Sequence, residues 1–355
     1  MDADRCDALL VVSFGGPEGA DDVLPFLERV TAGRGVPRQR LLEVAEHYHR
    51  FGGVSPINAQ NRALVAALEA ELGRRGWRLP VYWGNRNWHP LLADTVRQMA
   101  GDGIRRALAF VTSAFSSYPG CRQYLDDIER ARAEVGDRAP EVGKLRAFYN
   151  HPGFVRPMAR GLEATLAAVP EQQRRATRLV FTAHSIPVAM AQSSDYEAQL
   201  REACRLVCGL IGERGRARER YEWDLVYQSR SGSPRQPWLE PDVGDHLATL
   251  AASGIEDVVL VPIGFVSDHM EVRFDLDVEA KGVADKLGLR LHRAPTVGTD
   301  PELVAMIVDL VAERGRPESE RCRLGSERPR PDVCAPGCCP GPTQLAPSAQ
   351  GRPHP

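Results

Sequence analysis

The residues best able to do chemistry stand in one short stretch, VPIGFVSDHMEVRFDLDVEA, at positions 261–280. It opens as an apolar strand, and acids then recur at every fourth position, at Glu271, Asp275 and Glu279. Four-residue spacing places side chains on one face of a helix. A capping box of Asp268 and Glu271 would explain the first acid. The complete row would equally suit a solvated face, a divalent cation or a proton relay.

A histidine is the second candidate. His184 ends the apolar run RLVFTAH and is followed by Ser185 and Pro187, which predict a loop. A lone histidine is more often structural than catalytic. However, ligands of doubly wound sheets bind at the carboxyl ends of the strands, and imidazole can accept a proton or bind a metal near neutral pH. The position of His184 therefore favours function.

The elements that must hold these residues follow an alternating pattern. Strand patterns occur at 8–14, 79–83, 106–113 and 144–149, and again at 176–184, 223–229, 257–265 and 289–295. Helix patterns lie between them, which is typical of parallel βαβ units. We therefore predict an α/β fold of two similar doubly wound, Rossmann-like halves, each with a parallel four-stranded sheet. The predicted boundaries are residues 1–150 and 151–298 for the halves, 299–316 for a C-terminal helix and 317–355 for a cysteine-containing tail, disordered at its end.

Bulk composition excludes several functions. A net charge of −2 gives no electrostatic footprint for nucleic acid, and no apolar run reaches the length of a membrane span. The N-terminal residues carry acids where a signal peptide needs positive charge. We expect a cytoplasmic monomer that acts on a small molecule.

The tail is too polar to fold by burial, yet it is rich in cysteine. Cys322, Cys334, Cys338 and Cys339 all follow residue 316, among Pro, Gly, Arg and Ser. Four thiolates are the ligand count of a 2Fe–2S cluster or a structural zinc ion. Unliganded thiols in a disordered tail are the alternative.

Several motifs together resemble the ferrochelatases, including the bacterial enzymes that metallate coproporphyrin. In order along almost the whole chain they are SFGGPE, FGGVSPI, NWHP, FTAHSIP, YQSRSGSPRQPWLEP and SDHMEVRFDLDVEA. The ordered set is highly specific, although no single motif is decisive. The resemblance implies two chelatase-type halves with a porphyrin cleft between them and a C-terminal helix.

The resemblance also implies roles for individual residues. His184 and Glu271 match the pair that faces the porphyrin centre. Asp275 and Glu279 match acids on an unusual π-bulged helix, a possible outer metal site or proton path.

Other positions match contacts with the porphyrin edge, at Ser55, at Tyr124 and at Phe14. At the position of Phe14, some relatives have a tyrosine that reaches iron. A phenyl ring cannot ligate iron. For the tail, the resemblance favours a 2Fe–2S cluster over zinc. Because no cysteine lies between Cys121 and Cys204, a ligand at the start of the second half is missing, and Cys322 is the expected fourth ligand.

The function implied is insertion of Fe²⁺ into coproporphyrin III, with Fe²⁺ as substrate. Phe14 and the absence of an apolar lip favour coproporphyrin over protoporphyrin IX. A protoporphyrin ferrochelatase, a cobalt or nickel chelatase and a heme or metal carrier without turnover are the alternatives.

Overall fold

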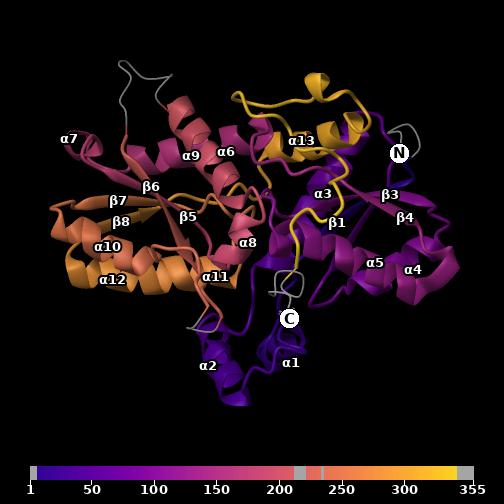
Figure 1. Ribbon diagram of the computed structural model, residues 1–355, viewed down its shortest axis with the longest axis horizontal. Coiled ribbons are helices and arrows are strands. Elements are labelled where there is room, and N and C mark those ends of the chain that lie inside the picture. The colour runs from indigo at the N-terminus through magenta and orange to yellow at the C-terminus, as the bar shows by residue number, and fades with distance from the viewer. Residues whose placement is uncertain (1–5, 212–220, 233–235, 342–355) are drawn as a thin grey trace, which may run out of the picture.

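The computed structural model describes residues 6–211, 221–232 and 236–341, and it contains two parallel four-stranded sheets. The strand orders are β2-β1-β3-β4 and β6-β5-β7-β8. The same order in both sheets confirms the predicted α/β class with two doubly wound halves. The central strands are apolar and buried, because helices cover both faces of each sheet (Figure 1).

The elements of the first sheet and its helices are β1 (Ala8–Ser13), α1 (Ala20–Val30), α2 (Arg38–His49), α3 (Ile57–Arg74), β2 (Val81–Asn85), α4 (Leu92–Gly101), β3 (Arg106–Val111), a π-helical turn η2 (Tyr118–Arg122), α5 (Gln123–Val135), a 3₁₀ turn η3 (Gly136–Arg138) and β4 (Glu141–Lys144).

The chain continues with α6 (Pro152–Ala167), α7 (Glu171–Arg174), β5 (Arg178–His184), α8 (Val188–Gln192), α9 (Tyr196–Ile211), β6 (Trp223–Gln228), α10 (Val243–Ala252), β7 (Asp257–Val261), α11 (Met270–Phe274), a π-helix η4 (Asp275–Ala280), α12 (Lys281–Leu287), β8 (Arg290–Arg293), α13 (Pro301–Ala312) and a 3₁₀ turn η5 (Glu318–Glu320).

Two predicted strands differ most from the structure. The fourth was predicted at 144–149, but β4 ends at Lys144, and the apolar residues after it leave the sheet. Phe148 packs between Phe110 of β3 and Phe154 of α6, with ring centroids 5.2 and 5.7 Å away. Burial against a helix produces the same apolar run as burial in a strand, so the pattern could not separate them. The seventh strand ends at Val261 because Pro262 has no N–H to donate.

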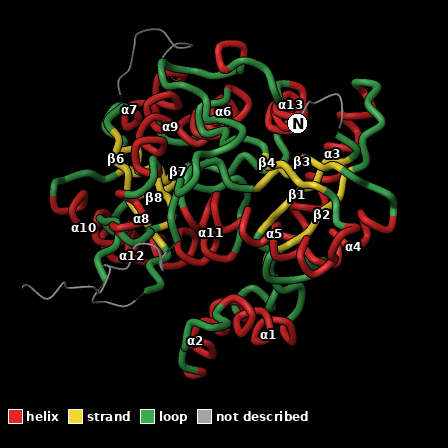
Figure 2. Tube along the Cα trace, turned by 45° about the vertical axis from the view of Figure 1, so that its right-hand side comes forward, coloured by secondary structure: helices red, strands yellow, loops and turns green. Residues whose placement is uncertain are grey.

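Helices α1 and α2 were not predicted, and they project together from the body below both sheets (Figures 1 and 2). They have a small core of their own, formed by Val23, Phe26, Leu27, Leu41 and Ala45. Phe14, directly after β1, packs against this core, with its ring centroid 6.2 Å from that of Phe26.

The two halves are joined by α13, which packs against α3 on one side and α6 on the other. Its C-terminal end carries Glu313, whose carboxylate binds the buried Arg146 at 2.6 Å. Within the described part of the chain, no helix is both long and apolar enough to cross a membrane.

The tail beyond α13 is held largely by polar contacts, as its composition predicted. Leu324 N–H donates to the Asn150 carbonyl at 2.8 Å, and Arg321 binds Asp332 at 2.6 Å. The end of the tail, where we predicted disorder, lies outside the described residues.

Candidate active site

His184 and Glu271 come together at the carboxyl edge of the second sheet. His184 is the last residue of β5, and Glu271 is the second residue of α11. The distance from His184 Nε2 to Glu271 Oε2 is 3.7 Å, longer than a direct hydrogen bond. His184 Nδ1 contacts the Ser185 carbonyl, so Nε2 is the ring nitrogen that faces the carboxylate. Both side chains are partly exposed, by 33% and 44%, and can therefore meet a ligand.

The helix that follows has an apolar row beside its acidic row. Val272, Leu276 and Ala280 are buried against the sheet and α10, also at four-residue spacing. In an α-helix, four residues turn about 40° beyond a full circle, so a four-residue row drifts sideways. The π-helical segment η4, from Asp275 to Ala280, has a wider turn that reduces this drift. The acids therefore stay on one side of the helix, and the π-helix implied by the sequence motif is confirmed.

The start of α11 differs from the capping box considered above. The N-cap residue is His269, whose Nδ1 accepts a hydrogen bond from the Glu271 N–H at 3.2 Å. Asp268 is instead held by Arg293 at 3.1 Å and by Thr296 at 3.0 Å. The Glu271 side chain is therefore not used as a cap. The histidine two residues before Glu271 was the sequence signal for this arrangement.

The two side chains of the pair shift each other's pKa. Burial lowers the pKa of His184, but the Glu271 carboxylate more than offsets this and raises it above its usual value. Burial in turn raises the pKa of Glu271, and the two neighbouring imidazoles, His184 and His269, outweigh this and lower it to about 2. Glu271 is thus ionised at neutral pH and available to a cation.

The pKa of the next acid in the row, Asp275, is shifted in the opposite direction. Burial, with repulsion from Glu271 and Glu279, raises the pKa of Asp275 to about 7, although a hydrogen bond from Ser229 lowers it. Burial and nearby Asp242 also raise the pKa of Glu279. A carboxyl group with a pKa near neutral, such as that of Asp275, fits either a proton path or a path for a cation.

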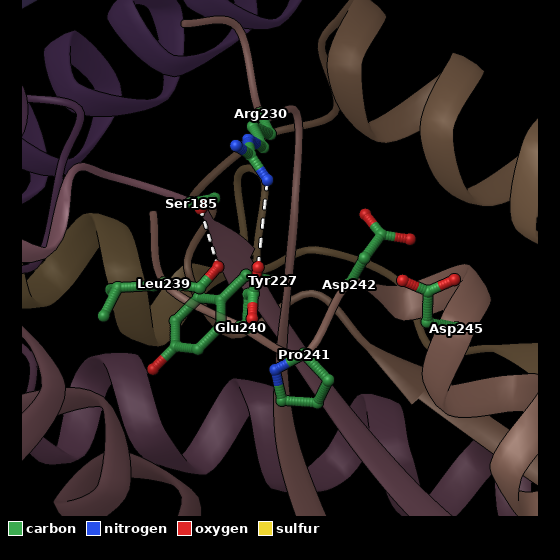
Figure 3. A pocket seen from close by; sticks show the side chains of 8 residues that line it. All are labelled: Ser185, Tyr227, Arg230, Leu239, Glu240, Pro241, Asp242 and Asp245. Atoms are coloured by element: carbon green, nitrogen blue, oxygen red, sulfur yellow. Dashed lines mark hydrogen bonds and ion pairs between the residues drawn. The ribbon is translucent and has the colours of Figure 1, made fainter. Parts of the chain in front are cut away.

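A cavity of about 440 Å³ lies on the second half, and Figure 3 shows the side chains that line it. Its lining residues are Ser185, Tyr227, Arg230, Leu239, Glu240, Pro241, Asp242 and Asp245. Ser185 follows His184 and donates to the Leu239 carbonyl at 2.9 Å, so one wall of the cavity is continuous with the pair. The residues expected at the porphyrin edge do not line it.

Those edge residues gather on the first half. The Arg86 guanidinium lies 4.6 Å from the Tyr124 ring centroid and 5.9 Å from that of Phe14. Ser55 packs against Gly16, where an added Cβ would come within 2.6 Å of the serine Cβ, so only glycine fits. Ser55 and Tyr124 are only 4% and 6% exposed. Burial is the largest cause of the raised pKa of the Tyr124 hydroxyl, and Glu271 of the second half makes a small further contribution.

Three of the four expected cysteine ligands lie in two thiol pairs, and the fourth lies in neither. The sulfurs of Cys338 and Cys339 are 3.7 Å apart, and the Cys334 thiol is hydrogen-bonded to that of Cys121. This hydrogen bond is the main reason why the pKa of Cys334 is lowered to about 7. Cys322 lies elsewhere.

The backbone of Cys322 is bound to Glu313 at 3.1 Å and to Arg146 at 2.8 Å. The cysteine that contacts Cys334 is Cys121, which precedes the predicted edge residue Tyr124 by three positions. No local sequence signal pairs Cys121 with the tail. Within the residues that the structure describes, no group of three or more His, Cys, Asp or Glu side chains is close enough to hold a metal ion.

Fold and site together define a chelatase-type α/β protein. A solved structure titled "SirB from Bacillus subtilis with Fe3+" has the same fold, with a TM-score of 0.54 at 10% identity, and the match covers 90% of this chain and 100% of that one. The ferrochelatase family model matches residues 6–315. The chain belongs to the ferrochelatase family.

Relatives match over nearly the full length. A "Ferrochelatase" of Rhodopirellula baltica is 54% identical over 98% of this chain and 97% of that protein. A "Coproporphyrin III ferrochelatase" of Streptomyces griseus is 51% identical over 94% and 93%, and one of Streptomyces coelicolor is 50% identical over 96% and 95%.

Proposed function

We propose that this protein inserts Fe²⁺ into coproporphyrin III. The observation that carries the proposal is the Glu271 carboxylate 3.7 Å from His184 Nε2, at the head of a row of acids. Support for the porphyrin comes from the relatives named coproporphyrin III ferrochelatases, at 50 and 51% identity.

Metal insertion makes two demands that the histidine and the acids can meet. Two pyrrole N–H protons must leave the porphyrin, and Fe²⁺ must lose its bound water as it enters the ring. A partly exposed imidazole can take a proton, and an ionised carboxylate can stabilise both an imidazolium and an incoming cation. His184 and Glu271 are the catalytic pair in this proposal, and each contacts the metal or a pyrrole proton of the porphyrin. Asp275 and Glu279 form the outer part of the path for Fe²⁺ or protons.

Anaerobic incubation with Fe²⁺ and either coproporphyrin III or protoporphyrin IX, followed by absorbance, tests the proposal. We expect the coproporphyrin spectrum to convert to that of the iron complex much faster than the protoporphyrin spectrum. Preference for protoporphyrin IX would reverse the substrate assignment. Heme retained tightly without consumption of either porphyrin would identify a carrier.

The buried hydroxyls of Ser55 and Tyr124 give a prediction about substrate affinity. As edge contacts they bind ground state and transition state alike, so Ser55→Ala and Tyr124→Phe should raise the KM for coproporphyrin and leave kcat nearly unchanged. Steady-state rates at varied porphyrin and saturating Fe²⁺ measure both constants.

Tyr82→Phe is the matched control, because the Tyr82 hydroxyl bonds Asp102 at an exposed position of β2. It should leave both constants unchanged. A collapse of kcat at constant KM in Ser55→Ala or Tyr124→Phe would contradict the edge assignment.

We further propose that the tail cysteines hold a 2Fe–2S cluster with Cys121 as the fourth ligand instead of Cys322. Two thiolates on one tetrahedral metal lie about 3.8 Å apart when the metal–sulfur bonds are about 2.3 Å, which the pair Cys338 and Cys339 nearly matches. Cys121 and Cys334 form the second pair. Two pairs suit a cluster of two iron atoms better than a single zinc ion, which needs all four sulfurs around one centre.

A 2Fe–2S cluster would give the protein a visible colour, which variants of its ligands should lose. Purified protein should be reddish brown, with visible absorption that bleaches on reduction. Cys334→Ser, Cys338→Ser, Cys339→Ser and Cys121→Ser should each lose this absorption. Binding of metal would offset the entropy of ordering a polar tail, so proteolysis after residue 316 should become faster in these variants.

Cys322→Ser is the matched control, since Cys322 is also a tail cysteine, and it should keep its colour. Loss of the cluster in Cys322→Ser with retention in Cys121→Ser would restore the ligand set first expected. A colourless protein with stoichiometric zinc would exclude the cluster.

A further inference from the structure

The end of β6 joins the histidine strand to the acidic row. In the parallel pairing of β5 with β6, Gln228 lies opposite His184, and its carbonyl accepts from the Ser185 N–H at 2.8 Å. Its side chain reaches across to the helix, where Nε2 donates to the Glu271 carbonyl at 3.1 Å. Gln228 is only 1% exposed. The strand end therefore fixes the position of α11 relative to His184.

The next residue has an unusual backbone. Ser229 has a φ of 62°, in the left-handed region that residues other than glycine rarely adopt. This conformation directs its hydroxyl to the Asp275 carboxylate, to which it donates a hydrogen bond. Sparsely populated backbone conformations of this kind persist where the surrounding structure requires them, and they concentrate at functional sites.

The hydrogen bonds to Asp275 are one-sided. Ser229 Oγ and Gln228 Nε2, the latter at 3.4 Å, both donate to Oδ2. Within the described part of the structure, both of these hydrogen bonds go to Oδ2 and neither goes to Oδ1. A carboxylate held by one oxygen keeps its second oxygen free to bind a cation.

We propose that Ser229 is a positioning residue for iron delivery, which holds Asp275 by Oδ2 so that Oδ1 faces the path of Fe²⁺ toward Glu271. The inference rests on the role proposed above for the acidic row. Ser229 itself does not contact the metal.

Gln228 is held in one orientation beside Glu271 and Asp275. Its Oε1 is buried, and it receives no hydrogen bond within the described part of the structure. Flipping the amide would turn that oxygen toward the Glu271 carbonyl and Asp275 Oδ2, which are both acceptors, so the orientation is determined by its neighbours.

A purely structural role for Ser229 makes different predictions. If only the left-handed backbone mattered, Ser229→Gly would remove the backbone strain, and the variant would be at least as active as the wild type. If the hydroxyl matters, Ser229→Gly and Ser229→Ala should be impaired to the same extent, because both lack it.

The test is a double-mutant cycle with Asp275→Asn, measuring the KM for Fe²⁺, kcat, and porphyrin affinity by fluorescence without metal. Ser229→Ala and Ser229→Gly should each raise the KM for Fe²⁺ about tenfold, since a hydrogen bond to a charged group is lost. Porphyrin affinity should stay within about twofold of wild type. Ser229→Ala added to Asp275→Asn should change the KM for Fe²⁺ by no more than about twofold, because the serine acts through that carboxylate.

Ser253→Ala is the matched control, since it removes a hydroxyl that donates to the α10 carbonyl of Thr249. Multiplicative effects in the double variant, a normal KM for Fe²⁺ in Ser229→Ala, or a normal Ser229→Gly beside an impaired Ser229→Ala would each overturn the inference. A normal KM for Fe²⁺ in Asp275→Asn would overturn the role of the acidic row and this inference with it. An effect in Asp275→Asn without one at Ser229 overturns this inference alone.

Discussion

Replacing His184 by alanine should abolish metal insertion while the porphyrin still binds. Positioned proton transfer contributes about 100- to 10,000-fold to a rate, so we expect a loss of at least about 100-fold in kcat. The His184 side chain contacts the Ser185 carbonyl and Glu271, and the edge residues on the other half remain in place. Anaerobic insertion rates and fluorescence titration with metal-free porphyrin measure the two quantities separately.

The matched control is His246→Ala. His246 also pairs with a carboxylate, since its Nε2 lies 3.0 Å from Asp224 Oδ2, but it belongs to α10, away from the edge of the sheet. It should insert iron at the wild-type rate. Insertion by His184→Ala within about tenfold of the wild type would remove His184 from the catalytic role.

Glu271→Gln should slow insertion by orders of magnitude and leave the fold intact. A capping role for the side chain would have predicted a loss of about 1 kcal/mol in stability. The cap is formed instead by His269 and the backbone N–H of Glu271, which glutamine retains. Because only the charge is lost, thermal unfolding should change little, whereas the insertion rate depends on a carboxylate that is ionised at neutral pH.

Glu302→Gln is the appropriate control. Its carboxylate is exposed to a similar extent and is ion-paired with Arg160 at 2.5 Å at the start of α13. It should turn over normally. A Glu271→Gln variant that melts early but turns over normally would show that the carboxylate acts in stability alone.

The order of the elements was available from local patterns. Alternating apolar runs and helical periods predicted two parallel sheets, because a strand covered on both faces must be apolar throughout. The end of such a strand is where ligands bind, so His184 could be selected from its position alone. The four-residue spacing of Glu271, Asp275 and Glu279 likewise predicted one helix face.

Local patterns could not distinguish two kinds of burial. The run after Lys144 has the composition of a strand, but its residues are buried against α6 and not in the sheet. Helices α1 and α2 were missed as well, although they carry a core of their own.

Contacts between distant segments were decided only by the tertiary structure. Cys121 and Cys334 are 213 positions apart, so no spacing rule connects them, and the sequence offered Cys322, which is nearer to the tail thiols along the chain, as the expected partner. The hydrogen bond from Ser229 to Asp275 arises in the same way, because β6 and η4 meet only when the sheet is assembled. The sequence by itself determined which side chains could do the chemistry and which strands end beside them. Their partners depended on packing between segments remote in sequence, which leaves no local pattern to read.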